Sequence, residues 1–145
     1  MITRKLAYGG AALLFAVGGM TAATGAASAA APAKAAASTC HPAKSGWTCS
    51  VGLGWAKAAK GSSYVKSDFW ANGEHLKLYD HYNNDHSTVA YLKVEGSGTA
   101  RFTSQGKTYR DINLSYSENK DVWTKVCTSG SSKAVCTGWS KVYTT

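Results

Sequence analysis

Residues 88–103 read Thr-Val-Ala-Tyr-Leu-Lys-Val-Glu-Gly-Ser-Gly-Thr-Ala-Arg-Phe-Thr. From Val89 to Val94, aliphatic side chains at every even position alternate with side chains such as Tyr91 and Lys93. This period of two is typical of a strand with one buried face and one exposed face. Gly96-Ser97-Gly98 then breaks the pattern with a turn composition. The stretch therefore predicts a strand, a reversal of the chain and the start of a second strand.

Segments of the same kind flank this stretch at intervals of about ten residues. They run from Trp47 to Trp55, Ser63 to Trp70, Glu74 to Tyr82, Thr99 to Thr103, Lys107 to Tyr116, Val122 to Cys127 and Ala134 to Tyr143. With Thr88 to Glu95 they make about seven or eight strands in succession without intervening helices, which favours antiparallel pairing. We expect an all-β fold, a small antiparallel β-sandwich.

Two local features refine this expectation. We expect Thr99–Thr103 and Lys107–Tyr116 to pair as a hairpin through residues 104–106, Ser-Gln-Gly. Phe102, Ile112 and Leu114 would point inward from that hairpin. One helical alternative exists at residues 54–60, where Ala and Lys favour a helix of at most about two turns.

The N-terminus has the pattern of a secretory signal peptide, which we assign to residues 1–29. Arg4 and Lys5 precede an apolar run, and Ala27-Ser28-Ala29 provides a small-residue cleavage site. The apolar run is shorter than the ~20 residues of a membrane span, so we expect a secreted protein that is not transmembrane. Removing the leader lowers the net charge from +8 to +6.

Residues 30–39 are alanine-rich and predict a flexible arm, or an arm that orders on a partner. The β-sandwich domain would then comprise residues 40–145. Val, Ile, Leu and Phe number only 16 of the 116 residues after the leader, whereas Trp and Tyr number 12. Because each such ring can bury roughly 150–250 Å², we expect an aromatic core. Trp47 and Trp139 would pack beside cysteines, with a recognition platform as the alternative.

Four cysteines form two pairs with equal spacing, Cys40 with Cys49 and Cys127 with Cys136. Three connectivities exist for four cysteines. We favour the two local disulfides, because residues 128–133 have a turn composition that would place the second pair across a hairpin. Closing a loop of about ten residues stabilises the fold by roughly 2.7 kcal/mol. The spacing lacks the C-x-x-C pattern typical of zinc sites.

Three of the four histidines lie in residues 74–86. If the chain turns through residues 82–85, His81 and His86 would sit opposite each other as candidate ligands for Zn²⁺ or Cu²⁺. A solvated turn is the plainer interpretation, because a defined third ligand is missing, and we expect no metal and no cofactor. Gly96-Ser97-Gly98 does not fit the G-x-S-x-G nucleophile elbow, so we expect no enzymatic activity.

The basic residues are dispersed. Their excess favours weak contact with anionic envelope polymers. The sequence contains no pattern typical of a nucleic-acid-binding module, so we expect no nucleic-acid partner.

The alanine-rich leader and arm, the two cysteine pairs and a domain rich in Gly, Ser, Thr, Trp and Tyr resemble small secreted β-proteins of Gram-positive actinomycetes. That group includes disulfide-stapled hydrolase inhibitors, sandwich-type chromophore carriers and adaptor subunits of umbrella-shaped antibacterial toxin particles. An arm at residues 30–39 ahead of a strand-rich domain is similar to the adaptors.

This resemblance implies a non-catalytic module that binds other secreted proteins. Contacts would come from the arm or from an exposed aromatic face, with these candidate residues: Ala30, Pro32, Lys34, Tyr79, Tyr82 and Tyr91. The first alternative is a protease inhibitor that presents Lys44 in the loop between Cys40 and Cys49. A small hydrolase or a carbohydrate-binding module is the remaining alternative.

Overall fold

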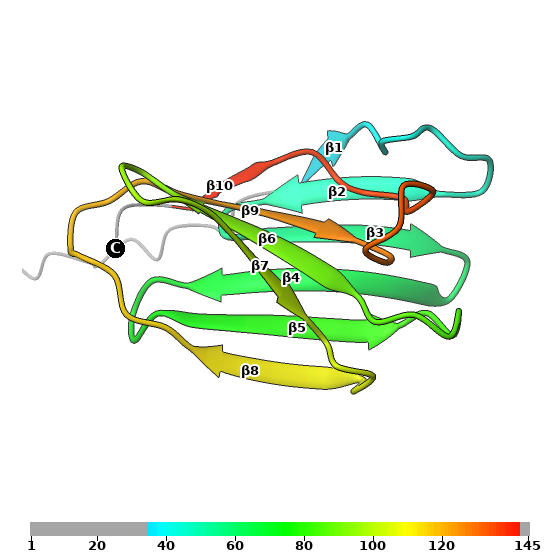
Figure 1. Ribbon diagram of the computed structural model, residues 1–145. Coiled ribbons are helices and arrows are strands. Elements are labelled where there is room, and N and C mark those ends of the chain that lie inside the picture. Colours follow the sequence, from blue (N-terminus) through cyan, green and yellow to red (C-terminus); the bar gives the residue numbers. More distant parts are fainter. Residues whose placement is uncertain (1–34, 143–145) are drawn as a thin grey trace, which may run out of the picture. The chain divides into compact units, whose positions relative to one another are not determined.

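Two antiparallel sheets form the part of the chain that the computed structural model describes, residues 35–142 (Figure 1). The six-stranded sheet has the order β1 (Ala36–Ser38), β2 (Thr48–Gly52), β3 (Trp55–Lys60), β4 (Ser63–Trp70), β5 (His75–His81) and β8 (Tyr109–Asn113). The four-stranded sheet has the order β10 (Ser140–Val142), β9 (Val122–Cys127), β6 (Val89–Val94) and β7 (Gly98–Thr103). The all-β antiparallel fold is therefore confirmed. The predicted leader and Ala30, Pro32 and Lys34 lie outside the described residues.

Ten strands occur in the described residues, against the seven or eight expected. One addition comes from residues 54–60, where the helical alternative is wrong and β3 forms instead. Ala56 and Ala58 of this strand are fully buried, while Lys57 between them is only partly buried. Alternate burial on a paired strand thus outweighs the local helix propensity of Ala and Lys, which is a weak preference. No helix of the described residues is long and apolar enough to cross a membrane.

The other addition is β1, which lies within the expected arm. Ala36 pairs with Val51 and Ser38 pairs with Cys49 across the β1–β2 ladder. The Ser38 hydroxyl also accepts a hydrogen bond from the Gly138 backbone N–H at 3.1 Å. A Cβ at position 138 would lie 2.7 Å from that hydroxyl oxygen, so glycine permits this close approach. The ordered sheet therefore begins at Ala36, ahead of the expected boundary at Cys40.

The expected hairpin between residues 99–103 and 107–116 is wrong. β7 pairs with β6 and β8 pairs with β5, so the chain changes sheets between β7 and β8. It also changes sheets between β5 and β6, and both crossings lie at the same end of the sandwich (Figure 1). Phe102 and Ile112 still pack against one hydrophobic cluster, as their inward positions predicted, but they reach it from opposite sheets.

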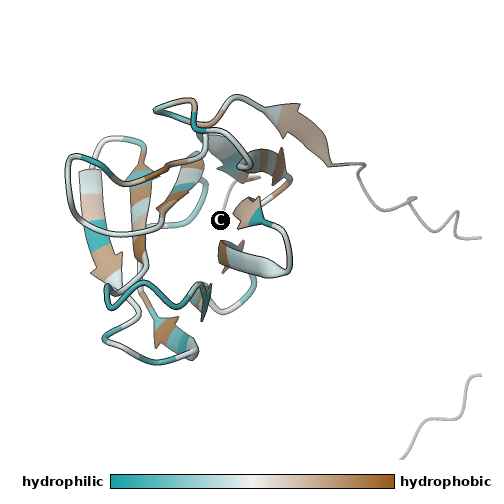
Figure 2. Cartoon of the chain, turned by 90° about the vertical axis from the view of Figure 1, so that its right-hand side faces the viewer, coloured by the Kyte–Doolittle hydropathy of each residue, from teal (hydrophilic) through white to brown (hydrophobic). Residues whose placement is uncertain are grey.

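The fully buried core is aliphatic, so the expectation of an aromatic core is wrong, although Trp47 packs against the cluster that contains Cys40 and Cys49, as expected. The largest fully buried side chains include Leu76, Leu78 and Leu92, and hydropathy alternates along the strands (Figure 2). Among the described residues Phe69 is the one aromatic side chain in the buried core, whereas Trp70 and Trp139 are 54% and 41% exposed. Small side chains, including Ala56, Ala58, Ser67 and Thr124, occupy several of the fully buried positions, and at the packing density of a protein interior these positions leave no room for indole rings.

One buried hydrogen bond joins the two sheets. The Ser67 hydroxyl of β4 lies 2.9 Å from the Thr124 hydroxyl of β9, and both residues are fully buried. Each hydroxyl satisfies the other, so neither is left unpaired in an apolar layer.

Replacing Ser67 by Ala would leave the Thr124 hydroxyl without a partner. We expect Ser67→Ala to lower the free energy of unfolding by about 1–3 kcal/mol, the cost of an unsatisfied buried group. The double variant Ser67→Ala/Thr124→Val removes both hydroxyls and should recover most of that loss. Urea unfolding measures both changes. A double variant as unstable as the single one would contradict this account.

Candidate functional site at the loop end

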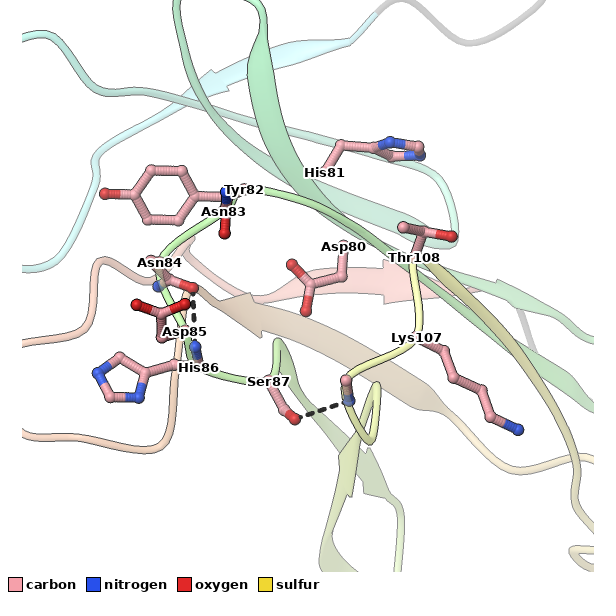
Figure 3. A pocket seen from close by; sticks show the side chains of 11 residues that line it. Asp80, His81, Tyr82, Asn83, Asn84, Asp85, His86, Ser87, Lys107 and Thr108 are labelled. Carbon is pink, nitrogen blue, oxygen red and sulfur yellow. Dashed lines mark hydrogen bonds between the residues drawn. The ribbon is translucent and has the colours of Figure 1, made fainter.

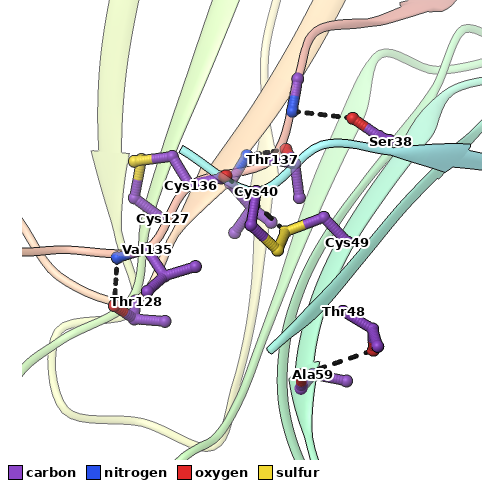
Figure 4. The surroundings of a disulfide bond; sticks show 12 residues. Ser38, Cys40, Thr48, Cys49, Ala59, Cys127, Thr128, Val135, Cys136 and Thr137 are labelled. Atoms are coloured by element: carbon purple, nitrogen blue, oxygen red, sulfur yellow. Dashed lines mark hydrogen bonds between the residues drawn. A yellow bond between two sulfur atoms is a disulfide. The ribbon is translucent and has the colours of Figure 1, made fainter. Parts of the chain in front are cut away.

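The two predicted disulfides, Cys40–Cys49 and Cys127–Cys136, are both present (Figure 4). Each closes a short local loop. The backbones of His41 and Cys136 exchange two hydrogen bonds of 2.8 Å, which place the two loops side by side. The described residues contain no free cysteine that could ligate zinc. The two disulfide-closed loops thus form one continuous wall at one end of the sandwich.

Asp80 holds the opposite wall, which consists of the two sheet-changing segments at this end of the sandwich, β5–β6 and β7–β8. Its Oδ2 accepts a hydrogen bond of 2.8 Å from the Thr88 backbone N–H and one of 2.7 Å from the Ser104 hydroxyl. The Asp80 N–H donates to the Thr108 carbonyl at 2.9 Å. One carboxylate therefore ties the segment after β5 to the segment after β7. These hydrogen bonds lie where β7 and β8 separate into different sheets.

Between these walls lie two adjoining cavities of about 520 and 360 Å³. Both are lined by Tyr82, Asn84 and His86, so this short loop is the ridge that separates them. The larger cavity lies toward Lys107 and Thr108 (Figure 3). The smaller lies toward the disulfide loops. We call the two cavities and their ridge the loop-end groove.

The ridge is fixed by contacts with both disulfide loops. The Tyr82 ring meets Trp47 edge to face, with 4.9 Å between ring centroids. The Asn84 side-chain amide donates to the Thr128 carbonyl at 3.1 Å. The Asn84 side-chain oxygen accepts from the His86 backbone N–H at 3.2 Å (Figure 3). Aromatic and amide groups are thus held in fixed positions within an accessible site.

The disulfide-loop wall also carries positive charge. Lys44 donates to the Lys133 carbonyl at 3.3 Å, which places the ammonium group of one disulfide loop on the backbone of the other. Lys44 and Lys133 line the smaller cavity, while Asp80 and Asp85 line the larger. The smaller cavity is therefore lined by cations alone among charged residues, whereas the larger is lined by both carboxylates and Lys107, an uneven distribution that suits directional polar recognition.

Four of the residues singled out from the sequence meet in this groove: Lys44, Tyr82, His81 and His86. Tyr79 and Tyr91 lie elsewhere, on the outer faces of the two sheets. Tyr79 packs against Tyr109 with 5.2 Å between ring centroids, and the ammonium of Lys125 lies 5.0 Å from the Tyr91 ring centroid.

His81 and His86 do not face each other, contrary to the hairpin hypothesis. β5 and β6 belong to different sheets, so the two histidines are not cross-strand neighbours. The His81 ring packs on Tyr64 at 4.7 Å, and the two imidazoles point in different directions (Figure 3). Within residues 35–142 no group of three or more His, Cys, Asp or Glu side chains is placed to hold a metal ion.

Sequence reasoning missed the contribution of the Cys127–Cys136 loop to the groove. Thr128, Ser129 and Ser131 line the smaller cavity, and the Ser129 hydroxyl lies 2.9 Å from that of Ser131. The cysteine spacing predicted the loop itself. Its position beside the first disulfide loop depends on the backbone pairing of His41 with Cys136, which no local pattern indicates.

Comparison with family models, with curated proteins and with solved structures finds no match to this chain.

Removing the charge at position 80 should loosen one wall of the groove. We expect Asp80→Asn to lower the free energy of unfolding by about 2 kcal/mol, because hydrogen bonds to charged groups contribute roughly 1.5–3 kcal/mol each. The matched control is Asp85→Asn, an exposed carboxylate in the same groove, which should change stability by less than about 0.5 kcal/mol. Thermal and urea unfolding of the three proteins measure this difference, and equal losses would contradict the assigned role of Asp80.

Proposed function

We propose that this protein is a secreted, non-catalytic interaction module that binds another secreted protein at the loop-end groove. The observation that carries the proposal is the convergence of two disulfide-closed loops and two sheet-crossing segments around one accessible groove. Loops that are already ordered lose little conformational entropy on binding. A rigid scaffold with recognition residues on its loops is a common arrangement in binding proteins.

The use of the acidic side chains supports a non-catalytic role. Asp80 accepts hydrogen bonds from Thr88 and Ser104, so its carboxylate serves the architecture of the groove. The Glu74 carboxylate accepts a hydrogen bond from the Tyr116 backbone N–H at 2.7 Å. It thereby links the start of β5 to the segment after β8. Burial, and secondarily the charge of Glu74, raise the pKa of Tyr116. These groups hold backbone segments in place, whereas acid–base catalysis needs groups directed at a substrate.

More specifically, we propose that the module is an adaptor in an extracellular antibacterial toxin assembly. An adaptor needs a second contact surface, and β1 supplies one. It is the terminal strand of its sheet, and within residues 35–142 only β2 pairs with it. An open strand edge can accept a strand from a partner. The groove and the β1 edge would then bind two different proteins.

Protease inhibition is the second candidate function, favoured by one observation. Residues 41–46 are all exposed and are fixed by a disulfide and by the pairing of His41 with Cys136. Inhibitors of proteases present rigid loops of this kind. The hydrogen bond from Lys44 to the Lys133 carbonyl, however, directs its ammonium toward the neighbouring loop. We therefore rank inhibition below the interaction module.

Tyr82 forms the ridge of the groove and is the first residue to test. Culture supernatant of the source cells is passed over the immobilised protein, and captured proteins are quantified by mass spectrometry. We expect Tyr82→Ala to reduce recovery of the partner at least tenfold, because hot-spot aromatic residues contribute about 2 kcal/mol or more. The control is Trp70→Ala. It removes a 54% exposed ring from the last residue of β4, at the end of that strand remote from the groove.

Equal recovery by the Tyr82 and Trp70 variants would contradict binding at the groove. Deleting residues 30–34 in the same experiment tests the predicted arm: loss of a partner that Tyr82→Ala still retains would assign that partner to the arm. Circular dichroism of each variant confirms that it is folded.

Lys44→Glu separates the two candidate functions. An inhibitor that uses Lys44 as its anchor would lose activity against a trypsin-like protease, because the primary specificity pocket of such a protease carries a carboxylate. We expect the unmodified protein to leave trypsin activity unchanged, and Lys44→Glu to have no effect in that assay. Stoichiometric inhibition by the unmodified protein, abolished by the substitution, would instead establish the inhibitor.

A further inference from the structure

We propose that the outer face of the four-stranded sheet binds a linear polyanion in extended form. This cation–aromatic face consists of Tyr91, Lys93, Arg101, Trp123, Lys125, Trp139 and Lys141. It is a surface separate from the loop-end groove, and the inference does not depend on the groove's function. The expected ligand is a flexible polymer with closely and regularly spaced phosphate or carboxylate groups.

Cations and aromatic rings alternate across this face in two neighbouring rows. In the first row Trp123 of β9 lies between Lys93 of β6 and Lys141 of β10, with ammonium-to-centroid distances of 4.9 and 5.7 Å. In the second row Lys125 lies between Tyr91 and Trp139, at 5.0 and 5.1 Å from their centroids. Each ring attracts the adjacent cation through its electron-rich face, and so restrains where the ammonium group lies.

Arg101 extends the second row. It lies opposite Tyr91 on β7, and its guanidinium reaches toward Gly130 of the Cys127–Cys136 loop. A Cβ at position 130 would lie 2.5 Å from the guanidinium Nη2, so glycine leaves the space that this side chain occupies. The second row therefore runs across β7, β6 and β9, with a cation on each side of Tyr91.

Acidic groups neutralise only part of the positive charge of this face. Among the described residues Lys141 pairs with Asp121 at 2.6 Å, whereas Lys93, Arg101 and Lys125 have no carboxylate partner. Adjacent strands lie about 4.8 Å apart and alternate residues of one strand about 6.8 Å apart, so neighbouring cations of the face are separated by about one Debye length. Their mutual repulsion favours a bound polyanion over an empty face.

The outer face of the six-stranded sheet has the same residue types but a different charge balance. Lys66 pairs with Asp68 at 2.9 Å, and Lys77 lies opposite Asp111 in the β5–β8 register. A hydrogen bond from His75 lowers the pKa of Asp111, so this carboxylate stays ionised at neutral pH. Carboxylates therefore offset most of the positive charge there. This contrast assigns the polyanion to the four-stranded sheet and provides a matched control surface.

The charge of the cation–aromatic face determines the expected ligand class. Trp123 has two ammonium groups within 5.7 Å of its centroid, and Tyr91 and Trp139 each have one within 5.1 Å, so a ligand that approaches these rings also meets positive charge. Lysines act as point charges for phosphate or carboxylate groups. Ionic contact with a flexible chain is therefore the mode of binding that the face favours.

Titration calorimetry with inorganic polyphosphate at about 50 mM salt tests the proposal. We expect Lys93→Gln/Lys125→Gln to weaken binding about 25-fold, since each lysine near an anionic surface contributes about fivefold. The control Lys57→Gln/Lys77→Gln removes the same charge from the other face and should stay within about threefold of the unmodified protein. Lys93→Arg/Lys125→Arg retains both charges and should restore binding.

Four outcomes would overturn the inference. These are no saturable binding of polyphosphate by the unmodified protein, equal weakening in the two Gln double variants, tighter binding to anionic vesicles than to polyphosphate, and tenfold tighter binding to an oligothymidylate of equal charge. Equal weakening in the two Gln double variants would assign binding to net charge alone. Tighter binding to vesicles would indicate a membrane ligand, and tighter binding to the oligothymidylate would indicate a nucleic acid. A parallel titration with polygalacturonate distinguishes carboxylate from phosphate polymers. Unchanged thermal unfolding of each variant excludes misfolding as the cause of weaker binding.

Discussion

The carboxylate of Asp80 is the constraint on which the architecture of the loop end depends. It binds the Thr88 backbone and the Ser104 hydroxyl, and so links two of the three segments where the chain moves from one sheet to the other, those after β5 and after β7. β8 joins the six-stranded sheet instead of pairing with β7, and the segments before β6 and after β7 form a wall of the groove that Asp80 holds together.

Most aromatic rings lie outside the buried core of this fold. Leu76, Leu78 and Leu92 are fully buried, and Ala56, Ala58 and the Ser67–Thr124 hydrogen bond occupy further buried positions. On the outer faces eight contacts join indole and phenol rings to lysines, while Trp47 and Tyr82 pack together in the groove. A chain with few aliphatic residues thus obtains an aliphatic core and two outer surfaces that carry aromatic rings, and the disulfides add stability at the loop end.

Much of the local structure was predictable, and the pairing of distant elements was not. Alternation of residue types located most strands, and the equal spacing of the cysteines indicated both disulfides. The expectation of a hairpin through residues 104–106 failed because alternation specifies which side chains of a strand face inward, without specifying its neighbour. The expectation that His81 and His86 face each other failed for the same reason. Tyr82 and Lys44 were identified from the sequence, but their convergence in one groove was not.

The sequence by itself determined the strands, the crosslinks and the inward-facing aliphatic residues, because these depend on periodicity and short spacings. The tertiary structure alone decided that two disulfide loops share one wall, that Asp80 ties two crossings, and that lysines alternate with rings across β6, β9 and β10. These features join residues that are distant in the chain. Their positions follow from strand order and register, which are set by the packing of all strands together rather than by any one segment.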